Sequence, residues 1–219
     1  MKDNLNYKKN LTILNGIKIA HRGLWNEKVP ENSLGAFERC INENVAIELD
    51  IHILKDDTLV VFHDSNLKRM TNIDINLNVA TYDEIKNLNL KNTNYKIPKL
   101  EEVLELVNGK VLLDIEIKEE GYEEEIVREI LSILDVNEFQ IRSFSESVIK
   151  KIKMINSNIF TILLIGNQYV KWGIFGRIPE VFPKGKIKRS NCDAVSPNYR
   201  LLILGFIKRM HRINKPVFA

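Results

Sequence analysis

The chain alternates between short apolar runs of strand length and segments whose apolar residues recur at helical spacing. Between the first two runs, Leu34, Phe37 and Ile41 mark one face of a helix. A strand, helix, strand order predicts parallel strands that are joined by helical crossovers. The strand-like runs lie at residues 17–21, 46–50, 112–118, 140–144, 161–165 and 193–197, and a seventh begins at 216–219.

One further apolar run, at residues 58–64, follows the second strand after a short turn signal, so it is expected to be the return arm of a hairpin. The remaining pattern is typical of an α/β barrel. A closed eight-stranded barrel needs about 250 residues, whereas this chain has 219 residues and 44% hydrophobic content.

The chain is expected to form one domain over residues 1–219, because no linker-like stretch or internal repeat divides it. No apolar stretch has the length of a signal-peptide core or a membrane span, and this favours a cytoplasmic location. Cys40 and Cys192 match no metal-ligand spacing, so both are expected to be reduced thiols.

Charge is distributed unevenly along the chain. From residue 140 onward 15 lysines and arginines face three acids, which leaves 17 against 26 in the first 139 residues. The basic part is a candidate surface for anionic partners, although lysines that merely solvate helices would give the same count. Nucleic acid is not expected as a partner, because aromatic residues are not interleaved with the basic ones.

Residues 171–189 combine basic side chains with Trp172, Ile174 and Phe175 in the least regular part of the chain. This composition suits contact with an anionic membrane surface, which would place the protein at the membrane periphery. A loop that folds over the substrate, or apolar packing against the barrel, is the alternative.

Acidic residues occupy alternate positions in two of the predicted strands. Glu48 and Asp50 share one face of their strand, and Asp114, Glu116 and Lys118 share one face of theirs. Carboxylates that lie side by side repel each other unless a proton or cation lies between them. Oxygen ligands suit Mg²⁺, Ca²⁺ or Mn²⁺. A buried layer of ion pairs with Lys118, without metal, fits the residues equally well.

Two of the four histidines, His21 and His63, end apolar runs, and Arg22 follows the first of them. Active sites of parallel barrels gather at the carboxyl ends of the strands. Two imidazoles and an arginine there suggest acid/base chemistry on an anion. We expect His52 to be a surface or hairpin residue, although its position just past the acid pair would also let it support the site, and we expect His211 to lie on a helix surface.

An ordered set of motifs resembles the glycerophosphodiester phosphodiesterase family. The resemblance is close over residues 17–118 and looser beyond. The motifs are HRG at 21–23, PENS at 30–33, ELDI at 48–51, VVFHD at 60–64, IPKLEEVLE at 97–105 and IEIK at 115–118.

The resemblance implies a TIM (β/α)8-type barrel. It also implies that Glu48, Asp50 and Glu116 hold one divalent cation, Mg²⁺ or Ca²⁺, with Mn²⁺ as a further candidate. The catalytic acid and base would be His21 and His63, and the substrate phosphate would be bound by Arg22 and Lys118.

The reaction that the resemblance implies is metal-dependent hydrolysis of a small-molecule glycerophosphodiester to glycerol phosphate and an alcohol. The glycerol 2-hydroxyl would attack phosphorus and form a cyclic phosphate, which water then opens. Two alternatives stay open: a degenerate or truncated non-catalytic barrel that binds phosphoesters, and lysophospholipase D activity at the same site.

Two features of the sequence are not settled by these motifs. Glu31 and Asn32 could support the site or cap the following helix. After residues 215–219 the family continues with a Trp-Thr-Val-Asn stretch, another helix and an eighth strand. The barrel is therefore expected to be truncated at its C-terminus, with the seventh strand begun and the eighth missing.

Overall fold

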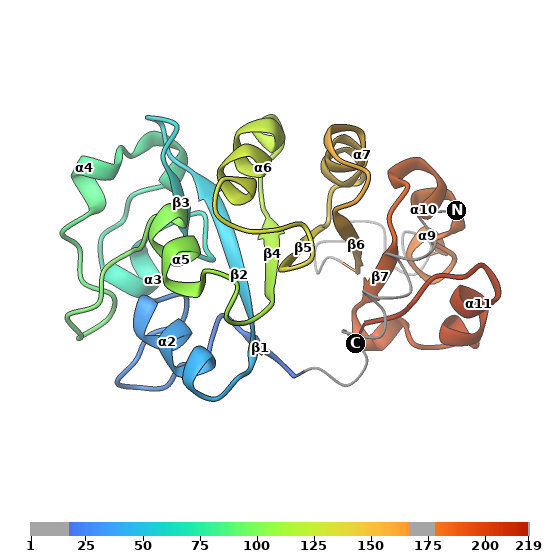
Figure 1. The fold of residues 1–219 in the computed structure, drawn as a ribbon, viewed down its shortest axis with the longest axis horizontal. Helices are drawn as coiled ribbons and strands as arrows, with labels where there is room; N and C mark the ends of the chain where they lie inside the picture. The colour runs from blue at the N-terminus through green and yellow to red at the C-terminus, as the bar shows by residue number, and fades with distance from the viewer. Residues whose placement is uncertain (1–17, 167–177, 219) are drawn as a thin grey trace.

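The structure is a computed structural model that describes residues 18–166 and 178–218. Strands of one sheet alternate with helices along the chain (Figure 1). In chain order the elements are β1 (Ile19–His21), α2 (Leu34–Asn42), β2 (Ala46–Ile53), β3 (Leu59–Val61), α3 (Lys68–Thr71), η1 (Leu77–Val79), α4 (Tyr82–Ile85), α5 (Leu100–Val107), β4 (Leu113–Ile117), α6 (Glu123–Leu131), β5 (Phe139–Ser143), α7 (Glu146–Ile155), β6 (Phe160–Ile165), α9 (Ile178–Val181), α10 (Lys184–Ser190), β7 (Ala194–Pro197), η2 (Tyr199–Leu201) and α11 (Phe206–Arg212).

The sheet has the order β1-β2-β4-β5-β6-β7, and every neighbouring pair in this order is parallel. β3 pairs with β2 in the antiparallel direction, which confirms the predicted hairpin. The sheet curls into a half-barrel with helices on its outer side, so the predicted α/β barrel fold is confirmed (Figure 1).

The predicted start of a seventh parallel strand is present after α11. Val217 forms a parallel bridge with Val195, whose N–H donates to the Pro216 carbonyl at 3.0 Å. At the other edge, β1 pairs with β2 alone within the part of the chain that the structure describes. The expectation of one domain over residues 1–219 stays a prediction, because residues 1–17, 167–177 and 219 lie outside the described ranges.

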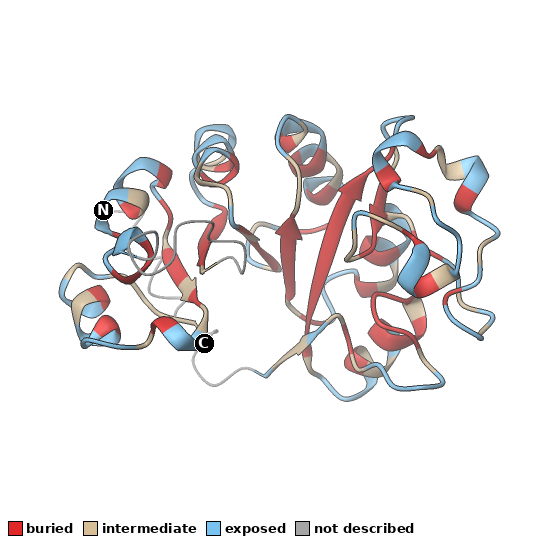
Figure 2. Ribbon diagram, turned by 180° about the vertical axis from the view of Figure 1, so that it is seen from behind, coloured by how far each residue is buried: buried red, intermediate tan, exposed pale blue. Residues whose placement is uncertain are grey.

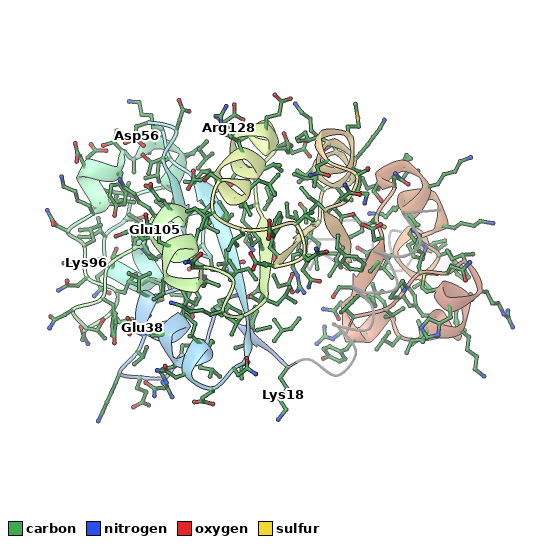
Figure 3. All side chains as sticks on the ribbon, viewed as in Figure 1. Lys18, Glu38, Asp56, Lys96, Glu105 and Arg128 are labelled. Atoms are coloured by element: carbon green, nitrogen blue, oxygen red, sulfur yellow. The ribbon has the colours of Figure 1, made fainter. Side chains whose placement is uncertain are left out.

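The main hydrophobic core lies between the outer face of the sheet and the helices. Ile47, Leu49 and Ile51 of β2 are buried there together with Phe37 of α2 and Leu104 of α5. Figure 2 shows β2 and β4 buried along their length, whereas the helices keep one exposed side. Charged side chains of these helices point outward, as Figure 3 shows for three labelled examples, Glu38, Glu105 and Arg128.

The inner face of the sheet carries the acidic residues. Glu48 lies opposite Asp114, and Asp50 lies opposite Glu116, in the register of β2 and β4. Glu116 in turn lies opposite Arg142 of β5. The predicted common face for the acids of two strands is therefore confirmed.

Three smaller expectations can be compared with the structure. Cys40 and Cys192 are both unpaired and buried, as the sequence predicts. His211 lies exposed on α11, also as predicted. No helix among the described residues is long and apolar enough to cross a membrane.

Candidate active and metal-binding site

A tight turn at the end of β1 places His21 and Arg22 beside the acids of β2. His21 lies opposite Glu48 in the strand register, and its Nε2 is 4.0 Å from Glu48 Oε2. The Arg22 backbone N–H donates to the same carboxylate oxygen at 2.9 Å. Arg22 has a φ of 60°, a conformation that is uncommon for residues other than glycine and that is found at functional sites.

Gly23 completes this turn with a φ of +80°. A Cβ at this position would approach the Cβ of Ala36 to 2.9 Å, because α2 packs directly against the turn. Glycine is therefore required here for both its conformation and its size. The turn holds the strand end against α2, and this fixes where His21 and Arg22 lie.

Glu48, Asp50 and Glu116 form the candidate metal site. All three are buried, and one carboxylate oxygen from each lies within 4.8 Å of the others. Asp50 Oδ1 is buried, and the Lys118 ammonium lies 2.8 Å from it. A group of carboxylate oxygens suits a hard divalent cation. The predicted metal ligands are thus brought together.

Lys118 lies next to the same carboxylates. Its Nζ is 2.6 Å from Glu116 Oε1 and 2.8 Å from Asp50 Oδ1, although the second contact lacks hydrogen-bond geometry. Burial alone would lower the pKa of Lys118, but the carboxylates of Asp50 and Glu116 outweigh burial and raise it. The ammonium is therefore charged at the edge of the site, where it can bind an anion.

Burial raises the pKa of Glu48 to about 8, and the negative charge of Asp50 adds to the effect. The pKa of His21 is lowered, first by partial burial and then by the positive charge of Arg22. A neutral imidazole can accept a proton, whereas an imidazolium can give one. The electrostatics of the site thus keep His21 available as a proton acceptor.

His63 lies on the predicted hairpin and not at the end of a parallel strand. It follows β3, the antiparallel return arm beside β2. Because β2 runs two residues past its pairing with β4, the return arm brings the chain back, and the Phe62 N–H donates to the Asp50 carbonyl at 3.0 Å. The rule that active-site residues lie at the carboxyl ends of parallel strands therefore explains the position of His21 but not that of His63.

The His63 ring is fixed by its neighbour in the sequence. His63 Nδ1 lies 2.6 Å from Asp64 Oδ1, so a proton on Nδ1 is shared with a carboxylate and Nε2 is left for other chemistry. The side chain is 33% exposed, which leaves it open to a substrate. This arrangement suits proton transfer through Nε2.

Glu31 and Asn32 support the site, and neither caps α2. The cap is Ser33, whose Oγ accepts the Ala36 N–H at 3.3 Å. Asn32 Nδ2 donates to Asp50 Oδ2 at 2.9 Å, and Glu31 Oε1 accepts from Arg22 Nη1 at 2.8 Å. Of the two alternatives that the sequence left open, the structure selects support of the site.

His52 lies in the β2–β3 hairpin, as expected, but the expectation of a surface position is wrong. His52 belongs to β2 but is 4% exposed. Its Nδ1 contacts the Glu119 carboxylate, and its Nε2 lies 3.0 Å from the His63 carbonyl oxygen. His52 therefore ties the loop after β4 to the backbone of His63.

A second ion pair lies on the same inner face of the sheet. Arg142 Nε donates to Asp114 Oδ1 at 2.7 Å, and its Nη2 contacts the other Asp114 oxygen. Burial raises the pKa of Asp114, and Arg142 opposes this shift. Because Asp114 is paired with Arg142, it does not belong to the group of acids that could hold a metal.

Comparison with known proteins assigns the family. The sequence model of the glycerophosphoryl diester phosphodiesterase family matches residues 21–219, and the chain belongs to this family. A glycerophosphodiester phosphodiesterase of Caldanaerobacter subterraneus subsp. tengcongensis is 36% identical over 148 residues, which cover 62% of this chain and 60% of that protein.

Two further relatives match shorter parts. A glycerophosphodiester phosphodiesterase of Bacillus altitudinis is 38% identical over 112 residues, 47% of this chain and 45% of that protein. A lysophospholipase D of Rattus norvegicus is 35% identical over 100 residues, 40% of this chain and 32% of that protein. The chain thus spans between a third and three fifths of the length of these relatives.

Solved structures share the fold. An Oleispira antarctica phosphodiesterase in complex with the product sn-glycerol-3-phosphate has a TM-score of 0.79 at 20% identity, and the match covers 96% of this chain and 86% of that one. The Thermotoga maritima glycerophosphodiester phosphodiesterase has a TM-score of 0.71 at 24% identity, with coverage of 92% and 84%. At this level of identity the likeness shows the fold alone.

Proposed function

We propose that the protein is a metal-dependent phosphodiesterase that hydrolyses glycerophosphodiesters to glycerol phosphate and an alcohol. The observation that supports this best is the arrangement of Glu48, Asp50 and Glu116. Around these three buried carboxylates, Arg22 Nε and Lys118 Nζ lie 3.6 Å and 2.8 Å from oxygens of Asp50, and His21 Nε2 lies 4.0 Å from Glu48 Oε2. Family membership supports the same reaction.

In the proposed reaction Arg22 and Lys118 bind the substrate phosphate and offset the charge that grows on its oxygens. The glycerol 2-hydroxyl attacks phosphorus, the bond to the leaving alcohol breaks, and water later opens the cyclic phosphate. Of His21 and His63, one takes the proton from the attacking hydroxyl and the other gives a proton to the leaving oxygen. The exposed rings suit this exchange with a bound substrate.

The proposed cofactor is one divalent cation, Mg²⁺ or Ca²⁺, with Mn²⁺ also compatible, held by Glu48, Asp50 and Glu116. The residues fit such an ion, because they offer only oxygen ligands and one carboxylate oxygen from each lies within 4.8 Å of the others. When bound, the ion would supply Lewis-acid stabilisation of a phosphate oxygen.

An assay on glycerophosphocholine, glycerophosphoethanolamine and a lysophospholipid, with and without EDTA, tests the proposal. We expect turnover of the first two, loss of turnover with EDTA, and recovery after the cation is restored. His63→Ala should abolish turnover, whereas the matched variant His211→Ala should not, because His211 lies exposed on α11. No turnover of any substrate by the parent protein would favour the non-catalytic phosphoester-binding alternative.

Lysophospholipase D activity at the same site is a second candidate, because relatives named lysophospholipase D match this chain. The same assay separates the two activities. A preference for the lysophospholipid over glycerophosphocholine would assign the protein to this second activity.

We also propose that the basic C-terminal part contacts an anionic membrane surface. Of residues 171–189, which the sequence suggested, 171–177 lie outside the described residues. In the described part, Ile178 is 51% and Phe182 is 52% exposed. The Arg209 guanidinium lies 4.3 Å above the Phe182 ring and so connects this apolar surface to α11.

Two further exposed apolar residues precede α11: Leu204 is 71% and Ile203 is 51% exposed. Residues 178–218 contain two acids, Glu180, which is buried, and Asp193, which pairs with Lys153. The same stretch has nine basic residues: Lys184, Lys186, Lys188, Arg189, Arg200, Lys208, Arg209, Arg212 and Lys215. Apolar side chains among basic ones suit an anionic bilayer, where each basic residue adds about 1 kcal/mol.

Sedimentation with phosphatidylglycerol vesicles, compared with phosphatidylcholine vesicles, tests this contact. We expect binding to the anionic vesicles, weaker binding for Leu204→Ser, and no change for Met154→Ser, a control residue that is 75% exposed on α7. Equal recovery with both vesicles would contradict the proposal. The cytoplasmic location stays a prediction, which cell fractionation can test.

A further inference from the structure

Arg69 of the short helix α3 lies between two carboxylates of the site. Its Nε donates to Asp64 Oδ2 at 2.5 Å, its Nη2 donates to Glu31 Oε1 at 2.7 Å and its Nη1 donates to Glu31 Oε2 at 3.2 Å. All three nitrogens of the guanidinium thus engage carboxylate oxygens. A planar fork with several donors can hold two carboxylates at once, which a lysine ammonium cannot do in the same geometry.

Each of these two carboxylates also holds a residue that is assigned to the reaction. Glu31 Oε1 accepts from Arg22 Nη1 at 2.8 Å, and Asp64 Oδ1 lies 2.6 Å from His63 Nδ1. The five side chains therefore form one continuous series in the order Arg22, Glu31, Arg69, Asp64 and His63. The series joins the end of β1 to the residue pair that follows β3.

The positive side chains in this series keep the Glu31 and Asp64 carboxylates ionised. Burial would raise the pKa of Glu31, yet the hydrogen bonds from Arg69 and Arg22 lower it, so the carboxylate stays ionised. The pKa of Asp64 is lowered in the same way: burial opposes the charge, and Arg69 and His63 outweigh it. Arg69 is thus the shared partner that keeps both carboxylates charged and in place.

Arg69 contributes little to the apolar core, because its side chain is 44% exposed. Among the described residues, its side-chain hydrogen bonds go to Glu31 and Asp64. The neighbouring Lys68, by contrast, pairs with Asp74 on the surface at 2.8 Å. The two adjacent cations of α3 therefore have separate roles, and they can be compared directly.

We propose that Arg69 is a positioning residue that fixes the phosphate-binding Arg22 and the proton-transferring His63 relative to each other. It acts through Glu31 on the first and through Asp64 on the second, and touches neither. The catalytic meaning of this inference rests on the proposed phosphodiesterase function.

The two branches predict different kinetic effects. Loss of the Glu31 branch frees Arg22, so substrate binding weakens and KM rises. Loss of the Asp64 branch frees the His63 ring, so proton transfer is less well oriented and kcat falls. Substitution of a residue that orients a functional group through a hydrogen bond typically lowers activity by about 10-fold to 100-fold.

Steady-state kinetics of Arg69→Gln, Arg69→Lys and the control Lys68→Gln on glycerophosphocholine test the proposal. We expect Arg69→Gln to lower kcat by about 10-fold to 100-fold and to raise KM. Arg69→Lys should recover little, because one ammonium cannot bridge both carboxylates. Lys68→Gln should match the parent. If the melting temperature of Arg69→Gln is well below that of the parent, only the kinetics of Arg69→Lys test the proposal, because this variant keeps the positive charge.

Coupling between variants separates positioning from general stability. Asp64→Asn should lower kcat more than it changes KM. Because Arg69 acts on His63 through Asp64, Arg69→Gln combined with Asp64→Asn should lower kcat no further than Asp64→Asn alone. Full multiplicative loss in the double variant would overturn the proposal.

A measurement that needs no turnover keeps this inference separate from the proposed function. Nitrogen-15 NMR of the His63 ring reports which nitrogen carries the proton. In the parent we expect the proton of the neutral ring on Nδ1, and in Arg69→Gln a shift toward Nε2. If the parent is inactive but the His63 signals respond in this way, the function proposal fails and the positioning role stands. Unchanged signals and kinetics in Arg69→Gln would refute the positioning role.

Discussion

Glu48 should make metal binding at this site depend on pH. The residue is 3% exposed, and burial together with the charge of Asp50 raises its pKa to about 8. A cation binds the ionised carboxylate, so the proton must leave when the ion enters. Lys118 does not titrate in the same range, because its pKa is raised. Affinity for the cation should therefore fall as the pH falls.

The size of the effect follows from the pKa of Glu48, which is about 8. At pH 7 about nine tenths of this carboxyl group is protonated, so binding should release about 0.9 proton and cost about 1.4 kcal/mol relative to alkaline pH. Each further unit below pH 7 should weaken binding about 10-fold. Between pH 9 and pH 6 the association constant should fall about 100-fold.

Isothermal titration calorimetry with Mg²⁺ and with Ca²⁺ measures both quantities. Titrations at one pH in two buffers with different ionisation enthalpies give the number of protons released. Glu48→Gln should remove the proton release and weaken binding, whereas Glu124→Gln, which changes an exposed acid of α6, should behave like the parent. An affinity that is constant from pH 6 to pH 9, with no proton release at pH 7, would refute this reasoning.

Three further predictions concern single residues. Gly23→Ala should lower the free energy of unfolding by more than about 1 kcal/mol in urea titrations, because the new Cβ would lie 2.9 Å from Ala36 Cβ; an unchanged midpoint would contradict this. His63→Ala should lose about 100-fold or more in rate and keep the parent circular dichroism spectrum; near-parental activity would remove it from the mechanism. Arg142→Met should destabilise by about 3–5 kcal/mol because it leaves Asp114 buried and unpaired, and adding Asp114→Asn should restore part of the loss.

Alternation within strands made the inner acidic face predictable. Glu48 and Asp50 in β2, and Asp114 and Glu116 in β4, are two positions apart with an aliphatic residue between them, so the two-residue period assigns each pair to one face without knowledge of the fold. The relative register of the strands could not be obtained this way. It decides that Asp50 lies opposite Glu116 and Glu48 opposite Asp114, and it depends on how the crossover helices pack.

His63 shows how a candidate residue can be selected by an incomplete argument. The rule that functional residues follow parallel strands selected it, but its position depends on an antiparallel arm that pairs with the far end of β2. The hairpin itself was predictable from the turn signal after Leu54. Its consequence for His52 was not, because the burial of that ring depends on Glu119, which lies 67 residues further along the chain.

The contacts that sequence reasoning missed are those between residues far apart in the chain. Glu31 and Arg69 are 38 positions apart, and Asp114 and Arg142 are 28 positions apart, so no local spacing connects either pair. A physical signal was nevertheless present in β5, where Gln140 and Arg142 interrupt an apolar strand on one face.

Arg142 of β5 indicates that one of the inner-face acids is paired with an arginine. An arginine whose strand position faces the inner side of a sheet needs an anion there, since a buried charge without a partner is costly. The inner face offers Glu48, Asp50, Asp114 and Glu116, and the pairing with Arg142 selects Asp114. With Asp114 paired, the other three carboxylates remain close together, with Lys118 and Arg22 beside Asp50. Arg142 therefore helps to define which acids are left to hold a cation, because its guanidinium donates to Asp114.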